Sequence, residues 1–151
     1  MVTVTPFLWF DADADEAIAL YRTAFPDLRI AQEGRMPDGS LQTATIEFAG
    51  QRLALLNGGP GHPHSDAFSL MISCDGQGEV DRLWDALLAG GGTPGRCGWL
   101  TDRFGVSWQV VPTRFLELTS EPDAQRVQRV IQAMFTMSKL DVAQLEAAAA
   151  G

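Results

Sequence analysis

The chain has 151 residues, and its apolar content of 46% with a charged content of 20% is typical of a globular protein with one full-sized core. Its formal net charge is −8 and its only lysine is Lys139, so it lacks the clustered cations that nucleic acid and anionic membranes attract. No apolar run could span a bilayer and the N-terminus lacks signal-peptide features, so we expect a cytoplasmic protein. Cys74 and Cys97 are too few for a disulfide scaffold.

The first part of the chain, residues 1–57, predicts a β-α-β-β-β module. A strand over Thr3–Phe10 leads into Asp11–Asp15, which supply capping groups and negative charge for the start of a helix. Pro26 ends this helix. Turn-rich segments then separate three predicted strands, which are Leu28–Arg35, Leu41–Phe48 and Arg52–Asn57.

A Gly/Pro-rich loop over residues 58–66 follows and contains both histidines, His62 and His64. Alternate residues in a loop flanked by prolines do not readily form a metal site. Exposure to solvent is the simplest interpretation of both, while a role facing a substrate stays open for one of them. Gly58–Gly61 precedes no predicted helix, so the phosphate-binding and dinucleotide-binding patterns are not met.

Residues 67–112 repeat the pattern of the first module. A strand over Phe68–Cys74 leads into a helix that ends at Gly90–Gly92. Strands are predicted at Thr93–Cys97, Trp99–Thr101 and Val106–Val111. We interpret the repeat as an internal duplication, with chance likeness of two generic patterns as the alternative. The predicted fold is α+β, with two β-α-β-β-β modules forming a curved mixed sheet around a cavity.

The last segment, residues 113–151, predicts C-terminal helices. Ser120 is the expected cap of the first helix, and a second short helix is expected near Asp141. One apolar stripe runs along the first helix and consists of Val127, Val130, Ile131, Met134 and Phe135. The stripe could cover its own sheet or a second subunit, and we favour a homodimer interface.

The predicted cavity is expected to combine aromatic walls with a few polar groups, which is typical of a small-molecule pocket. The alternative is that the aromatic side chains simply fill the concave face of the sheet. The candidate wall residues are Trp9, Trp99, Phe104 and Trp108, and the candidate polar residues are Arg35, Asn57, Asp102 and Gln109.

Three segments carry a family resemblance: TPFLWFD (Thr5–Asp11), LNGGP (Leu56–Pro60) and CGWLTDRFGVSWQVVPT (Cys97–Thr113). With the paired modules, they resemble the PhnB-like branch of the vicinal oxygen chelate superfamily, which includes glyoxalase I, bleomycin-resistance proteins and dioxygenases. This branch is often labelled 3-demethylubiquinone-9 3-methyltransferase. The segment PDAQRVQRVIQAM (Pro122–Met134) resembles the same branch. The resemblance covers nearly the whole chain and implies a single glyoxalase-like domain over residues 1–151.

The resemblance also implies where a catalytic metal would be held, because glyoxalase-type enzymes use four side chains, two from each module. The equivalent positions fall at Pro6 or Phe7, Ala54, Phe68 or Ser69, and Gln109. One amide does not make a metal site, so we expect no metal. Nothing resembles the Gly-rich turn that cradles S-adenosylmethionine, so we expect no cofactor and do not adopt the methyltransferase label.

The sequence therefore predicts a metal-independent protein that binds a small hydrophobic or aromatic metabolite. The alternative is a lyase or transferase of the superfamily that uses Asp102, Cys97 or His64 as acid or base. A third possibility is a structural or regulatory dimer with a vestigial pocket. The expected partners are a small-molecule ligand and a second copy of the chain, with no nucleic acid and no membrane.

Overall fold

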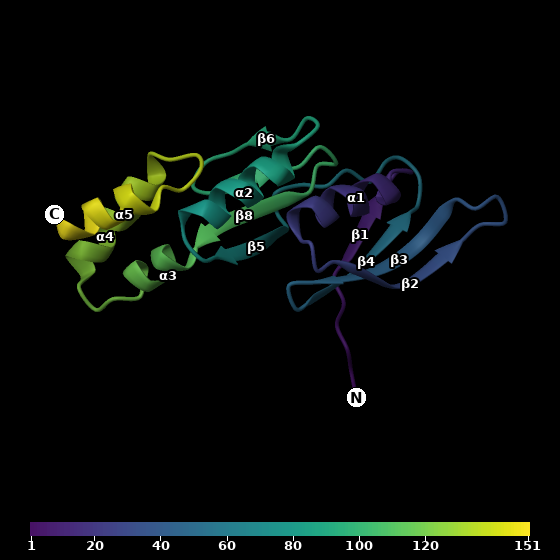
Figure 1. Ribbon diagram of the computed structural model, residues 1–151, viewed down its shortest axis with the longest axis horizontal. Coiled ribbons are helices and arrows are strands. Elements are labelled where there is room, and N and C mark those ends of the chain that lie inside the picture. Colours follow the sequence, from purple (N-terminus) through teal and green to yellow (C-terminus); the bar gives the residue numbers. More distant parts are fainter. The chain divides into compact units, whose positions relative to one another are not determined.

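A computed structural model describes all residues, 1–151, and the chain divides into two compact units, Met1–His64 and Ser65–Gly151. Each unit carries its own four-stranded mixed sheet, and the two sheets have the same topology (Figure 1). The α+β class and the two β-α-β-β-β modules are therefore confirmed. No helix combines the length and apolar character needed to cross a membrane.

The first unit contains one helix and four strands in the predicted order. They are β1 (Phe7–Phe10), α1 (Ala14–Ala24), β2 (Arg29–Arg35), β3 (Leu41–Phe48) and β4 (Gln51–Asn57). The strand order is β1-β4-β3-β2, with β1 parallel to β4 and the other pairs antiparallel. The helix α1 packs on one face of β3 and β4, where Leu53 and Leu55 are fully buried. The other face of the sheet carries Phe7, which is 60% exposed.

Strand β1 begins at Phe7 and not at Thr3 as predicted. The ladder to β4 ends with the bond from Ala54 N to Pro6 O, at 2.9 Å. Val2 and Val4 precede that point and are exposed. Alternating Val and Thr residues favour a strand, but a strand also requires a neighbour to complete its hydrogen bonds.

The start of α1 is capped by a residue that the sequence analysis placed elsewhere. Asp13 occupies the N-cap position, but its side chain makes no capping hydrogen bond. Instead, Ala14 N donates to Asn57 Oδ1 at 2.9 Å, and Asn57 Nδ2 donates to Leu41 O at 3.0 Å. Asn57 thus joins the end of β4 to the start of α1. The N-cap residue therefore lies in the expected acidic cluster, and Asp15 and Glu16 lie in the first turn, but the capping hydrogen bond comes from Asn57.

The second unit repeats this arrangement and adds three helices. Its elements are β5 (Ser69–Cys74), α2 (Gln77–Leu88), β6 (Thr93–Pro94), β7 (Trp99–Thr101), β8 (Ser107–Pro112), α3 (Thr113–Thr119), α4 (Ala124–Phe135) and α5 (Val142–Ala150). The strand order is β5-β8-β7-β6, with β5 parallel to β8. The helix α2 packs on β5, β7 and β8.

The strand predicted over Thr93–Cys97 is only two residues long. After Pro94 the chain turns, because Gly95 N donates to Trp99 O at 2.8 Å and Trp99 N donates to Arg96 O at 3.0 Å. Cys97 has a φ of 59°, an uncommon conformation for a residue other than glycine. Cys97 N donates to Met137 O at 2.9 Å and Gly98 N to Ser138 O at 2.8 Å, so this turn is bound to the C-terminal segment and does not continue the strand.

We call residues 113–151 the tail, and two of its helix boundaries differ from the prediction. Asp123, not Ser120, caps α4, because its carboxylate accepts hydrogen bonds from Gln125 N and Arg126 N, both at 3.1 Å. Ser120 Oγ instead donates to Leu116 O at the end of α3, a helix that the sequence analysis did not place. The predicted start of α5 at Asp141 is confirmed, since its side chain accepts from Gln144 N.

The apolar stripe of α4 is used within the second unit. Val130 is fully buried in a cluster with Leu118 of α3, and Leu145 and Ala149 of α5. Met134 packs against the same cluster. A partner for the stripe therefore exists within the chain, and the homodimer stays a prediction.

A polar latch holds the tail on α2. Gln77 Nε2 donates to Leu140 O at 3.1 Å, and Gln77 Oε1 accepts from Val142 N at 2.8 Å. Lys139 Nζ lies 2.8 Å from Asp81 Oδ1. The hydrogen bond from Lys139 lowers the pKa of Asp81 below its usual 3.8, and the same bond raises the pKa of Lys139 above its usual 10.5.

We expect the latch to make stability depend on pH at both extremes. The contribution of Asp81 is complete above its usual pKa and is lost as pH falls through the lowered value. That of Lys139 is complete below its usual pKa and is lost as pH rises through the raised value. In urea denaturation, the difference between wild type and Asp81→Asn should shrink between about pH 5 and about pH 3. The matched control is Asp66→Asn, in an exposed loop. A difference that does not change with pH would show that the pair contributes nothing.

Candidate functional site

An apolar pocket of about 510 Å³ lies in the second unit, between one face of its sheet and the helices α3 and α4. All of its lining side chains are uncharged. They are Met71, Cys97, Trp99, Gln109, Val111, Phe115, Leu116, Thr119, Ile131, Met134, Phe135 and Leu140.

The floor of the pocket is a row of side chains across three paired strands. Met71 of β5 lies opposite Gln109 of β8, and Trp99 of β7 lies opposite Gln109 on its other side. Val111 shares their face because alternate residues of a strand point the same way. Trp108 and Val110 point to the other face and are fully buried. The parallel β5–β8 pairing, which needs a crossover helix, therefore sets this row.

Gln109 is the polar group of the floor. Its Nε2 donates to Ser69 Oγ at 2.9 Å. This bond leaves the carbonyl oxygen and the second N–H of the amide without a partner among the hydrogen bonds of the pocket. The hydroxyl of Thr119 also lines the pocket, but it donates to Phe115 O at 2.9 Å within α3.

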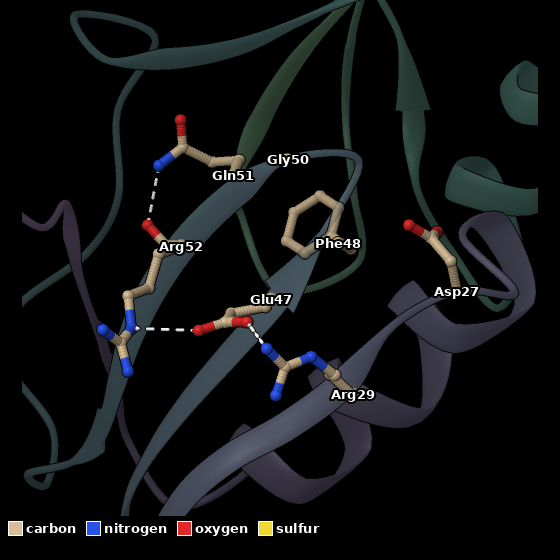
Figure 2. Close-up of a pocket in the computed structure, with 7 residues that line it drawn as sticks. All are labelled: Asp27, Arg29, Glu47, Phe48, Gly50, Gln51 and Arg52. Carbon is tan, nitrogen blue, oxygen red and sulfur yellow. Dashed lines mark hydrogen bonds and ion pairs between the residues drawn. The ribbon is translucent and has the colours of Figure 1, made fainter.

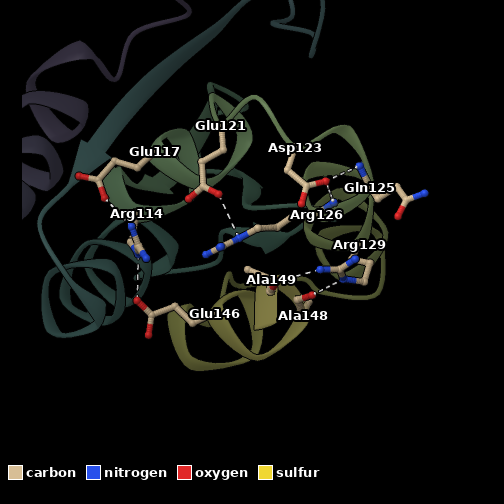
Figure 3. A network of polar contacts seen from close by, with 10 residues as sticks. All are labelled: Arg114, Glu117, Glu121, Asp123, Gln125, Arg126, Arg129, Glu146, Ala148 and Ala149. Carbon is tan, nitrogen blue, oxygen red and sulfur yellow. Dashed lines mark hydrogen bonds and ion pairs between the residues drawn. The ribbon is translucent and has the colours of Figure 1, made fainter. Parts of the chain in front are cut away.

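The tail forms the roof of the pocket, and a polar network holds it (Figure 3). Arg114 of α3 pairs with Glu146 of α5 at 2.9 Å. Arg129 of α4 donates from Nε to Ala148 O and from Nη2 to Ala149 O, both at 3.0 Å. These bonds satisfy carbonyl groups at the end of α5, where cations are favoured. The three helices thus pack as one layer, with α3 and α4 presenting apolar side chains to the sheet.

The structure brings three predicted site residues to this pocket, namely Trp99, Gln109 and Cys97. It also adds Met71 and the roof residues of α3 and α4, which the sequence analysis did not assign to a site. The apolar stripe of α4 was the available signal for the roof, but its spacing alone does not say which surface it covers.

Two further candidates, Asp102 and Trp108, lie together away from the pocket. Asp102 is 3% exposed. Its Oδ1 accepts from Phe104 N at 2.9 Å and Val106 N at 3.1 Å, and its Oδ2 accepts from Trp108 Nε1 at 2.9 Å. These bonds close the β7–β8 hairpin. Phe104 belongs to the same turn, and Arg103 lies over its ring.

The candidates Trp9 and His64 lie in the first unit. Trp9 Nε1 donates to Gly59 O at 2.8 Å, and its ring is 4.3 Å from that of His62. The ring of His64 is 5.5 Å from that of Phe10. The loop after β4 is thus folded against β1.

Arg35 and Asn57 also lie in the first unit. Arg35 is exposed and pairs with Glu33 at 3.1 Å and with Asp15 at 3.4 Å. Asn57 caps α1, as described above. Their roles as ligand contacts stay predictions.

The first unit has a smaller pocket of about 310 Å³, shown in Figure 2. Glu47 pairs with both Arg29 and Arg52. Asp27 is also engaged, because its Oδ2 accepts from Ala49 N at 2.9 Å. The two arginines therefore share one carboxylate, and their side chains are largely solvated, with 68% and 51% exposure. This pocket is a weaker candidate than the apolar one.

The residues at the metal positions implied by the glyoxalase resemblance do not fit a metal. In the first unit, Phe7 lies opposite Ala54, and neither can be a ligand. In the second unit, Met71 lies opposite Gln109, which is bonded to Ser69. An amide and a hydroxyl are a weak donor set for a catalytic divalent metal. No group of three or more His, Cys, Asp or Glu side chains is placed to hold a metal ion.

Comparison with solved structures identifies similar folds. The PhnB protein of Bacillus cereus is 26% identical, with a TM-score of 0.66 over 74% of this chain and 99% of that chain. Protein PA1353 of Pseudomonas aeruginosa is 22% identical, with a TM-score of 0.59 over 74% of this chain and 98% of that chain. The fosfomycin resistance protein FosX of Listeria monocytogenes, complexed with Mn(II) and sulfate, is 13% identical, with a TM-score of 0.54 over 72% of this chain and 89% of that chain. The last two likenesses show the fold alone.

No curated protein matches the chain. The family model described as 3-demethylubiquinone-9 3-methyltransferase matches residues 2–111, which include both modules up to β8. The tail that forms the roof of the pocket lies outside this match. Together with the likeness to the PhnB protein of Bacillus cereus, the match shows that the chain belongs to the PhnB-like family described as 3-demethylubiquinone-9 3-methyltransferase.

Proposed function

We propose that this protein binds a small hydrophobic or aromatic metabolite in the pocket of the second unit. The observation that carries the proposal is the pocket itself, which has a continuous apolar wall and one free amide edge on its floor. Its volume of about 510 Å³ is of the size that small-molecule sites have.

The lining suits an aromatic or aliphatic ligand. Trp99 offers a ring for stacking, and Met71 and Met134 are flexible side chains that adapt to different shapes. Met71 and Phe135 are 55% and 52% exposed. A ligand that covered them would remove apolar surface from water, which is the main favourable contribution to binding of this kind.

The same lining does not favour methyl transfer or acid–base turnover. S-adenosylmethionine carries a sulfonium, an ammonium and a carboxylate, and no charged side chain lines the pocket to pair with them. Cys97 is the only one of the acid–base candidates that lines the pocket. General acid–base catalysis usually needs a second group within reach of the same substrate, so binding without turnover is the better-supported function.

A fluorescence titration with the uncharged dye phenylnaphthylamine tests the proposal. Ile131→Lys places an ammonium group in the apolar wall and should weaken dye binding by about tenfold or more. The matched control is Val127→Lys, one turn earlier on α4, which is also partly buried but does not line the pocket. Its affinity should stay within about twofold of wild type. Equal loss in both variants, or no dye binding by wild type, would refute the proposal.

Thiol labelling locates the bound dye. Cys97 lines the pocket, whereas Cys74 is fully buried and burial raises the pKa of its thiol to about 11. Only Cys97 should therefore react with iodoacetamide in the folded protein. Saturating dye should slow that reaction in wild type. If the dye binds but does not change the rate at which iodoacetamide labels Cys97, the dye lies elsewhere.

A further inference from the structure

We infer that the pocket selects uncharged ligands carrying a neutral hydrogen-bonding group, such as an amide or a hydroxyl, and that Gln109 is the residue that recognises this group. The inference rests on the proposed function and narrows its ligand to a chemical class. The experiment must therefore distinguish failure of ligand binding in the pocket from failure of the selectivity for neutral ligands.

The absence of charge in the lining excludes ionised ligands on energetic grounds. An ion that leaves water needs a counter-charge or several hydrogen bonds to offset its lost hydration. Besides apolar groups, the walls supply one thiol, one amide, one indole N–H and one hydroxyl, and the hydroxyl of Thr119 is already bonded within α3. A carboxylate, a phosphate or an ammonium would therefore be bound without a counter-charge and with too few hydrogen bonds to offset its lost hydration, whereas a neutral analogue of the same shape has less hydration to lose.

Gln109 is held in position by its neighbours. Ser69 accepts one of its N–H groups at 2.9 Å. Met71 and Trp99 flank it on the adjacent strands. This arrangement fixes the amide on the floor and leaves one acceptor and one donor for a ligand.

An amide edge of this kind discriminates by hydrogen bonding. It can accept from a ligand hydroxyl or N–H, and it can donate to a ligand carbonyl. A purely apolar ligand would bury the amide without satisfying it, which carries a penalty. A site built around a hydrogen bond therefore rejects analogues that lack the matching group more strongly than a purely apolar site would.

Competition against bound phenylnaphthylamine tests the inference with four compounds that share one ring system. One is naphthalene itself, and the others are a naphthol, a naphthamide and a naphthoate that carry their substituent at the same ring position. The naphthamide and naphthoate have nearly the same shape but differ in charge. We expect the naphthamide to bind about tenfold or more tightly than the naphthoate. We expect the naphthol and the naphthamide to bind about threefold to tenfold more tightly than naphthalene.

Gln109→Leu isolates the contribution of the amide. In this variant the advantage of the naphthol and the naphthamide over naphthalene should disappear, while direct titration with naphthalene should give an affinity no lower than in wild type, which shows that the pocket is intact. Thr119→Val is the matched control, because it removes a polar group from the lining that is bonded only within α3. The advantage should persist in this control.

The outcomes separate the two proposals. Failure of all four compounds to displace the dye would overturn the proposed function. Displacement with equal affinity for the naphthamide and the naphthoate would leave the pocket standing and overturn the charge selectivity. An advantage of the naphthamide that survives in Gln109→Leu would overturn the role of Gln109. If Gln109→Leu fails to bind naphthalene, Ser69→Ala replaces it. Loss of the Ser69 bond should reduce the same advantage, and an unchanged advantage would count against Gln109.

Discussion

Replacing Asp102 by Asn is expected to lower the free energy of unfolding of the second unit by about 2–4 kcal/mol. Asp102 is buried and accepts three hydrogen bonds, two from backbone N–H groups and one from the indole of Trp108. The asparagine has one acceptor oxygen instead of two. Its amide group would place N–H donors against either the indole N–H or the backbone donors, and these buried groups would lose their partners.

Thermal and urea unfolding of Asp102→Asn measure this effect. Asp66→Asn removes the same charge in an exposed loop and should change stability by less than about 0.5 kcal/mol. Adding Trp108→Phe to the Asp102 variant should cost less than the sum of the two single changes, because the two residues share one bond. An Asp102→Asn variant as stable as wild type would contradict this structural role.

Gly58→Ala is expected to destabilise the first unit by about 1–3 kcal/mol. A Cβ atom at this position would overlap the indole ring of Trp9. The indole has little freedom to move, because its Nε1 is bonded to Gly59 O and its ring contacts His62. The backbone is restrained as well, since Gly58 N donates to Phe10 O at 2.9 Å.

Urea unfolding of Gly58→Ala in the otherwise unchanged chain, followed by circular dichroism, measures this effect. Gly78→Ala is the matched control: a Cβ at this position of α2 meets open space, and alanine should stabilise the helix by up to about 1 kcal/mol. If Gly58→Ala were as stable as wild type, the close approach of Trp9 would be absent in solution.

Several elements could be predicted from sequence because their patterns are local. The strand Leu41–Phe48 alternates apolar and polar residues and has the predicted bounds. The helix before Pro26 and the helix before Gly90–Gly92 carry apolar residues at helical spacing and are both present. The errors fall where a partner decides the outcome, as at Thr3–Thr5, which pair with no strand, and at Gly95–Cys97, where the tail binds the chain.

The candidate site was predicted less completely than the fold. Trp99 and Gln109 were expected at a pocket and line one. They lie within the strands β7 and β8, which the sequence also predicts. Asp102 and Trp108 also stand in this segment, but their mutual hydrogen bond turns them to the interior of the hairpin. A polar residue beside aromatic residues gives the same sequence pattern whether it lines a pocket or is buried inside a hairpin.

The sequence by itself determined the two β-α-β-β-β modules, the family and the uncharged character of the strand residues on the pocket floor. These features depend on residue type, on spacing and on the internal repeat. Only the tertiary structure decided that the tail roofs the pocket and that Asn57 caps α1. It also decided that Met71, Gln109 and Trp99 form one row. These features depend on strand register and on which surfaces meet, and long-range packing sets both, because one apolar stripe can cover any apolar face of the right size.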